Sequence, residues 1–303
     1  MNRLTFLVGP TAVGKTSVGI ALAERRGCEI LSVDARQIYK HLSVGTAKPT
    51  AEECARVRHH LIDLFEPTER VTAAAFAARF RDALAGIQAR GAGAIAVGGS
   101  GLYVDACLGR LDTMPAADAG VREAHERIRR EEGPEALHAR LEKVDPASAA
   151  RLSPRDFQRV SRALEVYETS GGRRLSDLQR GHGPLDLQGG PRMVLLSRDR
   201  GDLYRRIEAR AEAMLDGGLL GEIASLLERG VARDCPAFES IGYTEFAAVL
   251  AGEVPLERAR EHFLRRTRRY AKRQLTWFRN RYRGIEEVVI GEKESATDVA
   301  ARL

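Results

Sequence analysis

Eight consecutive residues near the start of the chain, GPTAVGKT at positions 9–16, combine two glycines with a lysine and a threonine. The apolar run at 4–8 predicts a buried strand and residues 17–26 predict a helix, so the glycines fall at a strand-to-helix turn. Such a turn directs backbone N–H groups and a helix N-terminus at an anion. Lys15 adds a mobile cation, and the Thr16 hydroxyl can hold a phosphate-bound Mg²⁺ ion. The stretch therefore predicts a diphosphate-binding loop, without indicating whose phosphates it binds.

Two further strand ends carry candidate site residues. Asp34 follows the apolar run 29–33, and a Gly-Gly pair with Ser100 follows the run 94–97. Ligands of open α/β sheets lie beyond the carboxyl ends of the strands, so we expect both segments to face the same crevice as the phosphate loop. Three roles remain open for Asp34: a carboxylate near Mg²⁺, a general base that takes a proton from a nucleophile, or a structural cap of the turn.

A predicted helix after residue 202 offers two more cations. Arg206 and Arg210 lie one turn apart on one side of it. If that side faces the crevice, both arginines are phosphate clamps. If it faces solvent, Glu208 and Glu212 are their ordinary ion-pair partners.

The pattern of elements predicts an α/β protein with an insertion. Residues 1–112 and 191–303 alternate strands with helices, which indicates a P-loop NTPase-like parallel sheet flanked by helices. Residues 113–190 contain helix after helix with no strand-like run, which predicts an inserted all-helical domain. A helix predicted over 155–168 has a polar face with Gln158, Arg159 and Arg162.

Composition narrows the class of protein. The chain has 303 residues, of which 44% are hydrophobic, enough for a packed core. Its four cysteines are scattered without a CxxC pair, so neither disulfides nor structural zinc is expected. The longest apolar runs are strand-sized, and we therefore expect a cytoplasmic enzyme with no membrane contact, by default a monomer.

The basic residues concentrate near the end of the chain. Between Arg258 and Arg283 there are eleven lysines or arginines against a single acid, Glu261. An apolar stripe at helical period predicts one long helix, with arginines at 265, 269 and 273 at four-residue steps beside it. So dense a stripe of one sign repels itself unless an anion shares it. The pattern favours a nucleic-acid backbone as that anion.

These stretches together resemble the bacterial tRNA dimethylallyltransferases, also called tRNA isopentenyltransferases, over essentially the whole chain. The pieces that carry the resemblance are GPTAVGKT, SVDARQIY, GTAKP, HHLID, VGGSGLY, RDFQRVSRALEV, the IGY at 241–243 and AKRQLTWFR. The resemblance implies transfer of a dimethylallyl group from dimethylallyl diphosphate to N6 of the adenosine immediately 3′ of the tRNA anticodon. It also implies that the phosphate loop holds the pyrophosphate of this donor rather than ATP, with Mg²⁺ as cofactor.

The resemblance also implies roles for individual residues. Asp34 would be the base, while Lys15, Thr16 with Mg²⁺, and Arg210 would stabilise the leaving pyrophosphate. The expected diphosphate-binding residues are Gly9, Pro10, Thr11, Ala12, Val13, Gly14, Lys15, Thr16 and Arg206. The expected contacts to the tRNA anticodon stem-loop are Asp34, Ala35, Arg36, Gln37, Ser100, Arg122, Gln158, Arg159, Val160, Ser161, Arg162, Lys272, Arg273, Gln274 and Arg279. Ser100 stands where the family more often has threonine, and Ala35 where many relatives have serine.

Two other classes of function stay open from the sequence. A small-molecule kinase would use the same loop for ATP and Asp34 to activate a hydroxyl, but it leaves the basic helix unexplained. An RNA-binding module without catalysis would keep the basic helix but has no need of Lys15, Thr16 and Asp34 together. Consumption of ATP would distinguish the first class, and RNA binding without product the second.

Overall fold

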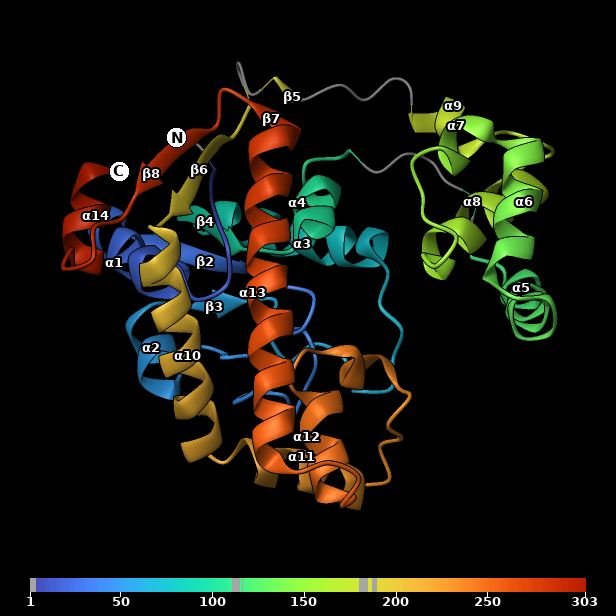
Figure 1. The fold of residues 1–303 in the computed structure, drawn as a ribbon. Coiled ribbons are helices and arrows are strands. Elements are labelled where there is room, and N and C mark those ends of the chain that lie inside the picture. Colours follow the sequence, from blue (N-terminus) through green and yellow to red (C-terminus); the bar gives the residue numbers. More distant parts are fainter. Residues whose placement is uncertain (1–3, 111–114, 116, 180–184, 187–189) are drawn as a thin grey trace. The chain divides into compact units, whose positions relative to one another are not determined.

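The computed structural model of the chain describes residues 4–110, 115, 117–179, 185–186 and 190–303 (Figure 1). Packing divides the chain into two units, which we call the core unit, Met1–Arg110 with Pro184–Leu303, and the insertion, Leu111–Gly183. The boundaries predicted from the sequence, 112/113 and 190/191, fall within seven residues of these. Within the described residues, no helix has both the length and the apolar composition that crossing a membrane requires.

A parallel sheet of six strands forms the centre of the core unit. Its order is β3-β2-β4-β1-β6-β8, and every neighbouring pair is parallel. The strands are β1 (Thr5–Val8), β2 (Cys28–Val33), β3 (His59–His60), β4 (Gly93–Gly98), β6 (Arg192–Ser197) and β8 (Glu286–Val289). Because all strands run the same way, their carboxyl ends meet at one edge, where the segments that follow them can form a shared site.

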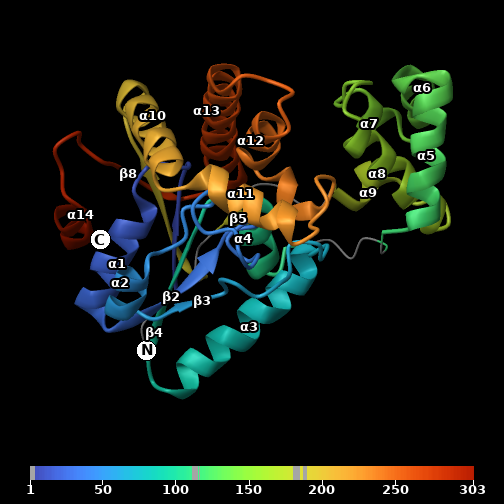
Figure 2. The ribbon, with the colours of Figure 1, turned by 90° about the horizontal axis from the view of Figure 1, so that it is seen from below.

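Helices cover both faces of this sheet. Figure 2 shows α1 (Lys15–Arg26) on one face and α3 (Ala73–Ala89) on the other, as right-handed crossovers in opposite directions require. The other helices of the core unit are α2 (Ala51–Arg56), α4 (Gly101–Cys107), α10 (Arg200–Asp216), α11 (Leu219–Glu228), the 3₁₀ helix η1 (Pro236–Glu239), α12 (Tyr243–Leu250), α13 (Leu256–Arg281) and α14 (Ala296–Arg302). Two short strands, β5 (Leu185–Asp186) and β7 (Tyr282–Arg283), pair separately.

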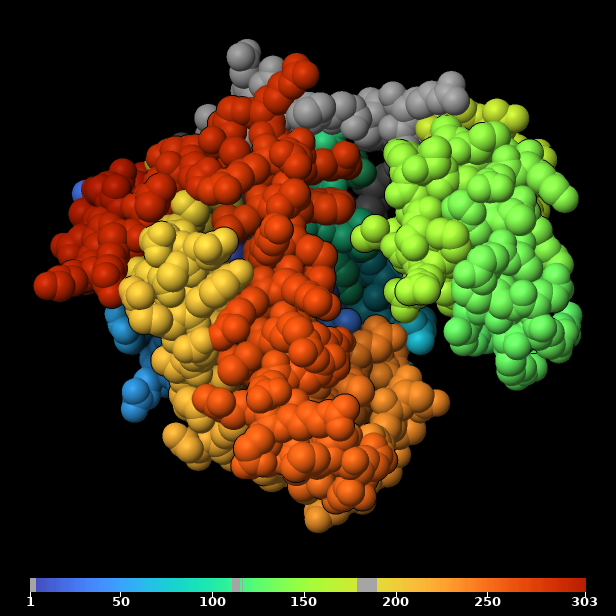
Figure 3. Space-filling model, in the orientation of Figure 1, coloured from blue at the N-terminus to red at the C-terminus, as the bar shows by residue number. Residues whose placement is uncertain are grey.

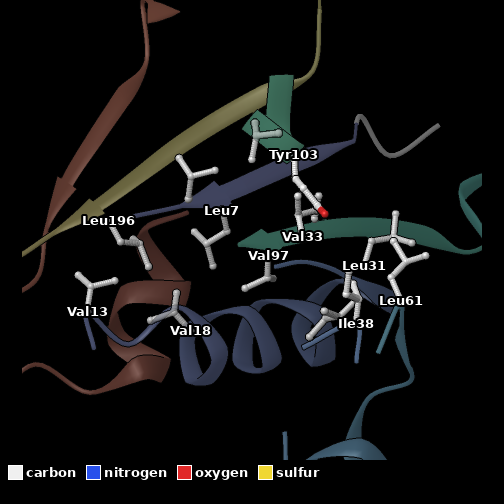
Figure 4. Close-up of a cluster of buried hydrophobic side chains, with 14 of the residues drawn as sticks. Leu7, Val13, Val18, Leu31, Val33, Ile38, Leu61, Val97, Tyr103 and Leu196 are labelled. Atoms are coloured by element: carbon white, nitrogen blue, oxygen red, sulfur yellow. The ribbon is translucent and has the colours of Figure 1, made fainter. Parts of the chain in front are cut away.

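The apolar faces of the strands bury the first helix. Leu7, Val33 and Val97 come from three adjacent strands, and α1 presents Val18 to them (Figure 4). Burying one such side chain fully stabilises the fold by about 1.5–3 kcal/mol. The sheet and α1 are therefore a rigid base for the loop that joins them.

The insertion has a small apolar core of its own. Its helices are α5 (Ala119–Glu132), α6 (Pro134–Val144), α7 (Pro146–Ala149), α8 (Phe157–Thr169) and α9 (Leu175–Gln179). Leu137 and Leu141 of α6 pack against Val160 and Leu164 of α8. All five elements in the described part of the insertion are helical, in agreement with the periodicity of its sequence.

A buried ion-pair cluster holds the two ends of the insertion together. The Glu165 side chain is fully buried and accepts hydrogen bonds from Arg122, Arg162 and the backbone N–H of Asp118. Burial opposes its ionisation, but the hydrogen bonds from the two arginines outweigh burial and hold the pKa of Glu165 below its ordinary value. The cluster therefore contributes stability above the unfolded-state pKa of about 4.3, and this stability is lost as the pH falls through the lowered value.

We expect Glu165→Ala to destabilise the insertion selectively. Removing a buried ion-pair partner costs about 3 kcal/mol where the remaining charges can turn to solvent, as the partly exposed Arg122 and Arg162 can. Hydrogen exchange should speed up in peptides of α5 and α8 and stay unchanged in the central sheet. Glu123→Ala, which removes an exposed carboxylate of α5, is the control. Unchanged protection of α5 and α8 in the Glu165 variant would contradict this role.

Candidate active site

The phosphate loop occupies the turn between β1 and α1. Ala12 and Gly14 have positive φ angles of 64° and 106°, the conformation in which glycine is favoured. Gly14 is the N-cap of α1 and supplies no side-chain cap to the first N–H groups of the helix. These N–H groups and the positive end of the helix dipole stay available to an anion.

Lys15 turns back onto the loop. Its Nζ donates to the carbonyl oxygens of Gly9, at 3.0 Å, and Pro10, at 2.8 Å. Burial lowers the pKa of Lys15 to about 7; the negative charge of Asp34 opposes this shift, and the positive charge of Arg210 adds to it. The ammonium is therefore held in a site that favours its neutral form until an anion enters.

Three arginines from one side of the sheet bind the loop. Arg206 donates to the carbonyl of Ala12 at 2.9 Å, and Arg210 donates to the hydroxyl of Thr11 at 3.2 Å. Arg198, which the sequence did not indicate, donates to the carbonyl of Val13 at 2.9 Å. Arg206 and Arg210 therefore both lie at the phosphate loop, and their role as phosphate clamps stays a prediction.

The alternative ion pairs considered from the sequence do not form. Glu208 pairs with Arg268, and Glu212 with Arg260, both from α13. These partners hold α10 against α13 and leave Arg206 and Arg210 directed at the phosphate loop.

Asp34 lies at the turn after β2, and its two carboxylate oxygens differ in their hydrogen bonds. Oδ1 accepts from the N–H of Arg36 at 2.8 Å and of Gln37 at 3.3 Å, which caps the turn. Oδ2 has no hydrogen-bond partner among the described residues. Asp34 lines a cavity of about 40 Å³ together with Lys15 and Thr16. One oxygen thus fixes the carboxylate while the other stays free to accept a proton.

The end of β4 closes the crevice beside Asp34. The hydroxyl of Ser100 accepts a hydrogen bond from the N–H of Ala35 at 3.0 Å and also contacts the Tyr270 hydroxyl of α13. A Cβ on Gly99 would lie 2.4 Å from Nε2 of Gln274 and 3.3 Å from Nζ of Lys15. Only glycine permits this approach of the strand end to the phosphate loop.

Gln274 has a different position from the one expected. Its side chain is 5% exposed. Its Oε1 accepts from the N–H of Thr11 at 2.8 Å, and its Nε2 donates to the carbonyl of Gly99 at 2.9 Å. The side chain joins the phosphate loop to the end of β4, and this role replaces the RNA contact predicted for it.

Two other predicted RNA contacts also make bonds within the protein. Arg36 donates to the carbonyl of Pro236 at 2.8 Å. Gln37 donates to the carbonyls of Thr46 and Ala47 and accepts from the Ser32 hydroxyl. Both side chains hold loops around the Asp34 turn.

The predicted contacts in the insertion fall into three groups. Gln158 and Arg159 are exposed on α8. Val160 and Ser161 are buried, the latter against His125 at 2.9 Å. Arg122 and Arg162 bind Glu165 and remain 43% and 29% exposed, so each keeps part of its guanidinium accessible.

The basic stretch of α13 is partly neutralised by the protein itself. Five of its eleven cations have carboxylate partners: Arg260 with Glu212, Arg266 with Glu245, Arg268 with Glu208, Arg279 with Glu287, and Arg281 with Asp105. The argument that the whole stripe needs an external anion is therefore too strong, and the predicted contact Arg279 is one of the paired residues.

Four of the six remaining cations gather on one side of the helix. Arg265, Arg269, Lys272 and Arg273 are exposed and have no carboxylate partner in the part of the chain that the structure describes. The first three line a groove of about 670 Å³ between α10 and α13, which lie side by side on the face shown in Figure 3. A bound polyanion would gain the most electrostatic stabilisation on this surface, because the protein does not neutralise these cations itself.

Sequence reasoning missed two parts of the site. Arg198 follows β6 directly, and β6 pairs with β1, so the strand-end argument used for Asp34 would have found it. Glu222 binds three successive backbone N–H groups, those of Ser43, Val44 and Gly45, and its carboxylate also accepts from the Tyr243 hydroxyl at 2.6 Å. No local pattern marks Glu222, because its partners lie about 180 residues away.

Comparison with known proteins identifies the family. A family model described as IPP transferase matches residues 37–281, most of the chain. The chain belongs to this family. It is 47% identical over 281 residues to the tRNA dimethylallyltransferase of Halorhodospira halophila, covering 92% of this chain and 90% of the relative. It is 45% identical to that of Geobacillus kaustophilus, covering 92% and 88%.

Solved structures of IPP transferase family relatives share the fold. The tRNA isopentenylpyrophosphate transferase of Bacillus halodurans matches with a TM-score of 0.68 and 38% identity, over 95% of this chain and 90% of that one. A eukaryotic dimethylallyltransferase described as acting on tRNA matches with a TM-score of 0.74 and 25% identity, over 99% and 75%. These neighbours bear out the parallel sheet with a phosphate loop predicted from the sequence.

We expect the phosphate loop to take up protons when an anion binds. The pKa of Lys15 is about 7 in the free protein, and a bound diphosphate raises it. Binding of inorganic pyrophosphate at pH 8 should therefore consume nearly one proton more in the native protein than in Lys15→Arg. Calorimetry in two buffers of different ionisation enthalpy measures this difference. Equal uptake by the two proteins would show that Lys15 is already charged at pH 8.

Proposed function

We propose that this chain transfers a dimethylallyl group from dimethylallyl diphosphate to N6 of the adenosine immediately 3′ of the anticodon in tRNA, releasing diphosphate. The observation that carries the proposal is the crevice that Asp34 lines together with Lys15 and Thr16 of the phosphate loop. Arg206 and Arg210 contact the same loop at Ala12 and Thr11. The chain is an enzyme of the tRNA dimethylallyltransferase class, since relatives of that name are 44–47% identical to it over nine-tenths of its length.

The loop cations stabilise the leaving group. In the reaction the bond between the allylic carbon and the diphosphate oxygen breaks, and negative charge grows on that oxygen. Lys15 and Arg210 are the two loop cations that interact electrostatically with Asp34. Fixed cations in a site poor in water stabilise such charge without reorganising during the step.

Asp34 receives the proton from the nucleophile. Adenine N6 is a weak nucleophile and must leave the base stack to be held in line with the allylic carbon. As the N6–C bond forms, the amino group loses a proton, and Oδ2 of Asp34 is the free acceptor in the crevice. The cap on Oδ1 keeps the carboxylate in one orientation while this happens.

Thr16 is the residue that would hold Mg²⁺. It opens α1 and lines the same cavity as Asp34, so a hydroxyl and a carboxylate oxygen are both present, and oxygen ligands are what Mg²⁺ prefers. The described residues contain no cluster of three metal-binding side chains, so the remaining ligands would be phosphate and water. A bound Mg²⁺ supplies further positive charge to the diphosphate.

The tRNA would lie on exposed polar and basic side chains. Lys272 and Arg273 of α13, and Gln158 and Arg159 of the insertion, are the predicted contacts whose side chains are exposed. Phosphate contacts position the RNA and make its binding salt-dependent. We further propose that the enzyme works as a monomer in the cytoplasm.

A transfer assay tests the function directly. Purified protein is incubated with Mg²⁺, labelled dimethylallyl diphosphate and bulk bacterial tRNA, with ATP and free nucleosides as parallel substrates. We expect label on the adenosine 3′ of the anticodon and no consumption of ATP. Consumption of ATP without labelled tRNA would identify a small-molecule kinase, and RNA binding without product would identify a binding module.

We expect Asp34→Asn to lower kcat by about 10²- to 10⁴-fold, the usual contribution of a positioned base. Asparagine keeps an oxygen that can cap the turn and loses the carboxylate that takes the proton. The Kd for tRNA, measured by filter binding, should stay unchanged. Asp82→Asn on the exposed side of α3 is the control. Turnover within twofold of the native rate would remove Asp34 as the base.

We expect the double variant Lys272→Ala/Arg273→Ala to bind tRNA more weakly and with a flatter salt dependence. The slope of log K against log[salt] should fall by about 1.4–1.8, because each of the two phosphate contacts contributes about 0.7–0.9. Affinity for dimethylallyl diphosphate should not change.

The matched control is Arg56→Ala/Arg233→Ala. It removes the same net charge from two exposed arginines that are already paired with Glu24 and Glu253. An equal change of slope in both double variants would assign the effect to net charge rather than to the surface of α13.

A further inference from the structure

Arg198 is a buried arginine with one free end beside the phosphate loop. It follows β6, whose Leu195 pairs with Val8 immediately before the loop. The side chain is 6% exposed. Its Nε donates to the carbonyl of Val13 at 2.9 Å, and its Nη1 donates to Asp202 at 2.9 Å and to the carbonyl of Gly291 at 3.1 Å. Nη2 has no hydrogen-bond partner among the described residues.

The free end of Arg198 meets that of Arg206 at the start of α1. A Cβ placed on Gly14 would lie 3.9 Å from Nη2 of each arginine. Burial and then the charge of Arg198 lower the pKa of Arg206, while Asp202 opposes the shift. Two guanidinium groups that converge on the N-terminus of a helix form a site that an anion between them would stabilise.

The cations around the loop thus form two separate groups. Lys15 and Arg210 both interact with Asp34 and reach the loop at residues 9–11. Arg198 and Arg206 reach it at Ala12, Val13 and Gly14. A diphosphate likewise has two phosphates, and the one that bears the breaking bond must face Asp34.

We propose that Arg198 is a ligand of the terminal phosphate of the donor, with Lys15 and Arg210 holding the phosphate attached to the allyl group. The assignment rests on the proposed function for the identity of the donor. Nε and Nη1 fix the plane of the guanidinium, so that Nη2 is oriented before the diphosphate binds. The Asp202 carboxylate binds Nη1 of Arg198, whereas Nη2 is the guanidinium nitrogen that lies near Gly14.

The test compares two ligands that differ by one phosphate. Calorimetry measures the binding of dimethylallyl diphosphate and dimethylallyl monophosphate to the full chain and to Arg198→Met. A charge-assisted hydrogen bond corresponds to about 10- to 100-fold in affinity, so the Kd for the diphosphate should rise by that factor. The Kd for the monophosphate should change by less than about twofold, since Lys15 and Arg210 remain. An equal loss for both ligands, or no loss, would overturn the assignment.

Two further variants separate ligand binding from a structural role. Arg198→Lys keeps the cation and the fold-stabilising charge near Asp202, and it should lose less diphosphate affinity than Arg198→Met; a lysine variant that weakens both ligands equally would assign Arg198 to loop structure alone. Arg200→Met removes an exposed arginine at the start of α10, and it should bind both ligands as the native protein does. Direct binding does not require transfer, so absence of labelled tRNA together with a selective loss of diphosphate affinity would refute the proposed function and leave Arg198 assigned.

Discussion

The Gln274 side chain hydrogen-bonds to two segments that lie 263 and 175 residues before it in the chain. One amide thereby joins the phosphate loop, the end of β4 and α13. Because this amide is buried, removing either partner would leave an unpaired polar group at a cost of about 1–3 kcal/mol. The Asp34 turn depends on the same bridge, since Ser100 at the end of β4 binds the N–H of Ala35. The distance between base and phosphate loop is set by this chain of hydrogen bonds.

Ion pairs decide which cations of the core unit stay available to an anion. Glu208 and Glu212 of α10 neutralise arginines of α13, which leaves Arg206 and Arg210 of α10 for the phosphate loop. The acids thus determine which cations stay available: a small set at the loop and another on the outer side of α13. A protein with the same composition and different pairing would present its excess charge elsewhere, so net charge alone carries little information about where an anion binds.

Much of the fold followed from local sequence patterns. The strands β1, β2 and β4 are apolar runs, and each was predicted within two residues at its ends. The periodic segment of α13 was predicted as one long helix. β3 and β8 were not predicted, because both are short, polar strands at the two edges of the sheet. Such strands are defined by their pairing rather than by burial. In the site, the loop, Asp34 and Ser100 were predictable because each follows a strand. The roles of Gln274 and Arg36 were not, because their partners are distant in sequence and no local pattern encodes them.

The bridge made by Gln274 has a consequence for how the protein is made. The phosphate loop, Asp34 and the arginines that contact the loop are all synthesised by Arg210, but the side chain that fixes the loop against β4 comes more than 60 residues later. The sheet itself gains its edge strand β8 only after that. A nascent chain still attached to the ribosome therefore holds the loop sequence without the means to order it. Such contacts across nearly the whole chain form late, because closing long loops is slow. Donor binding to the ordered loop thus has to wait until α13 has been synthesised.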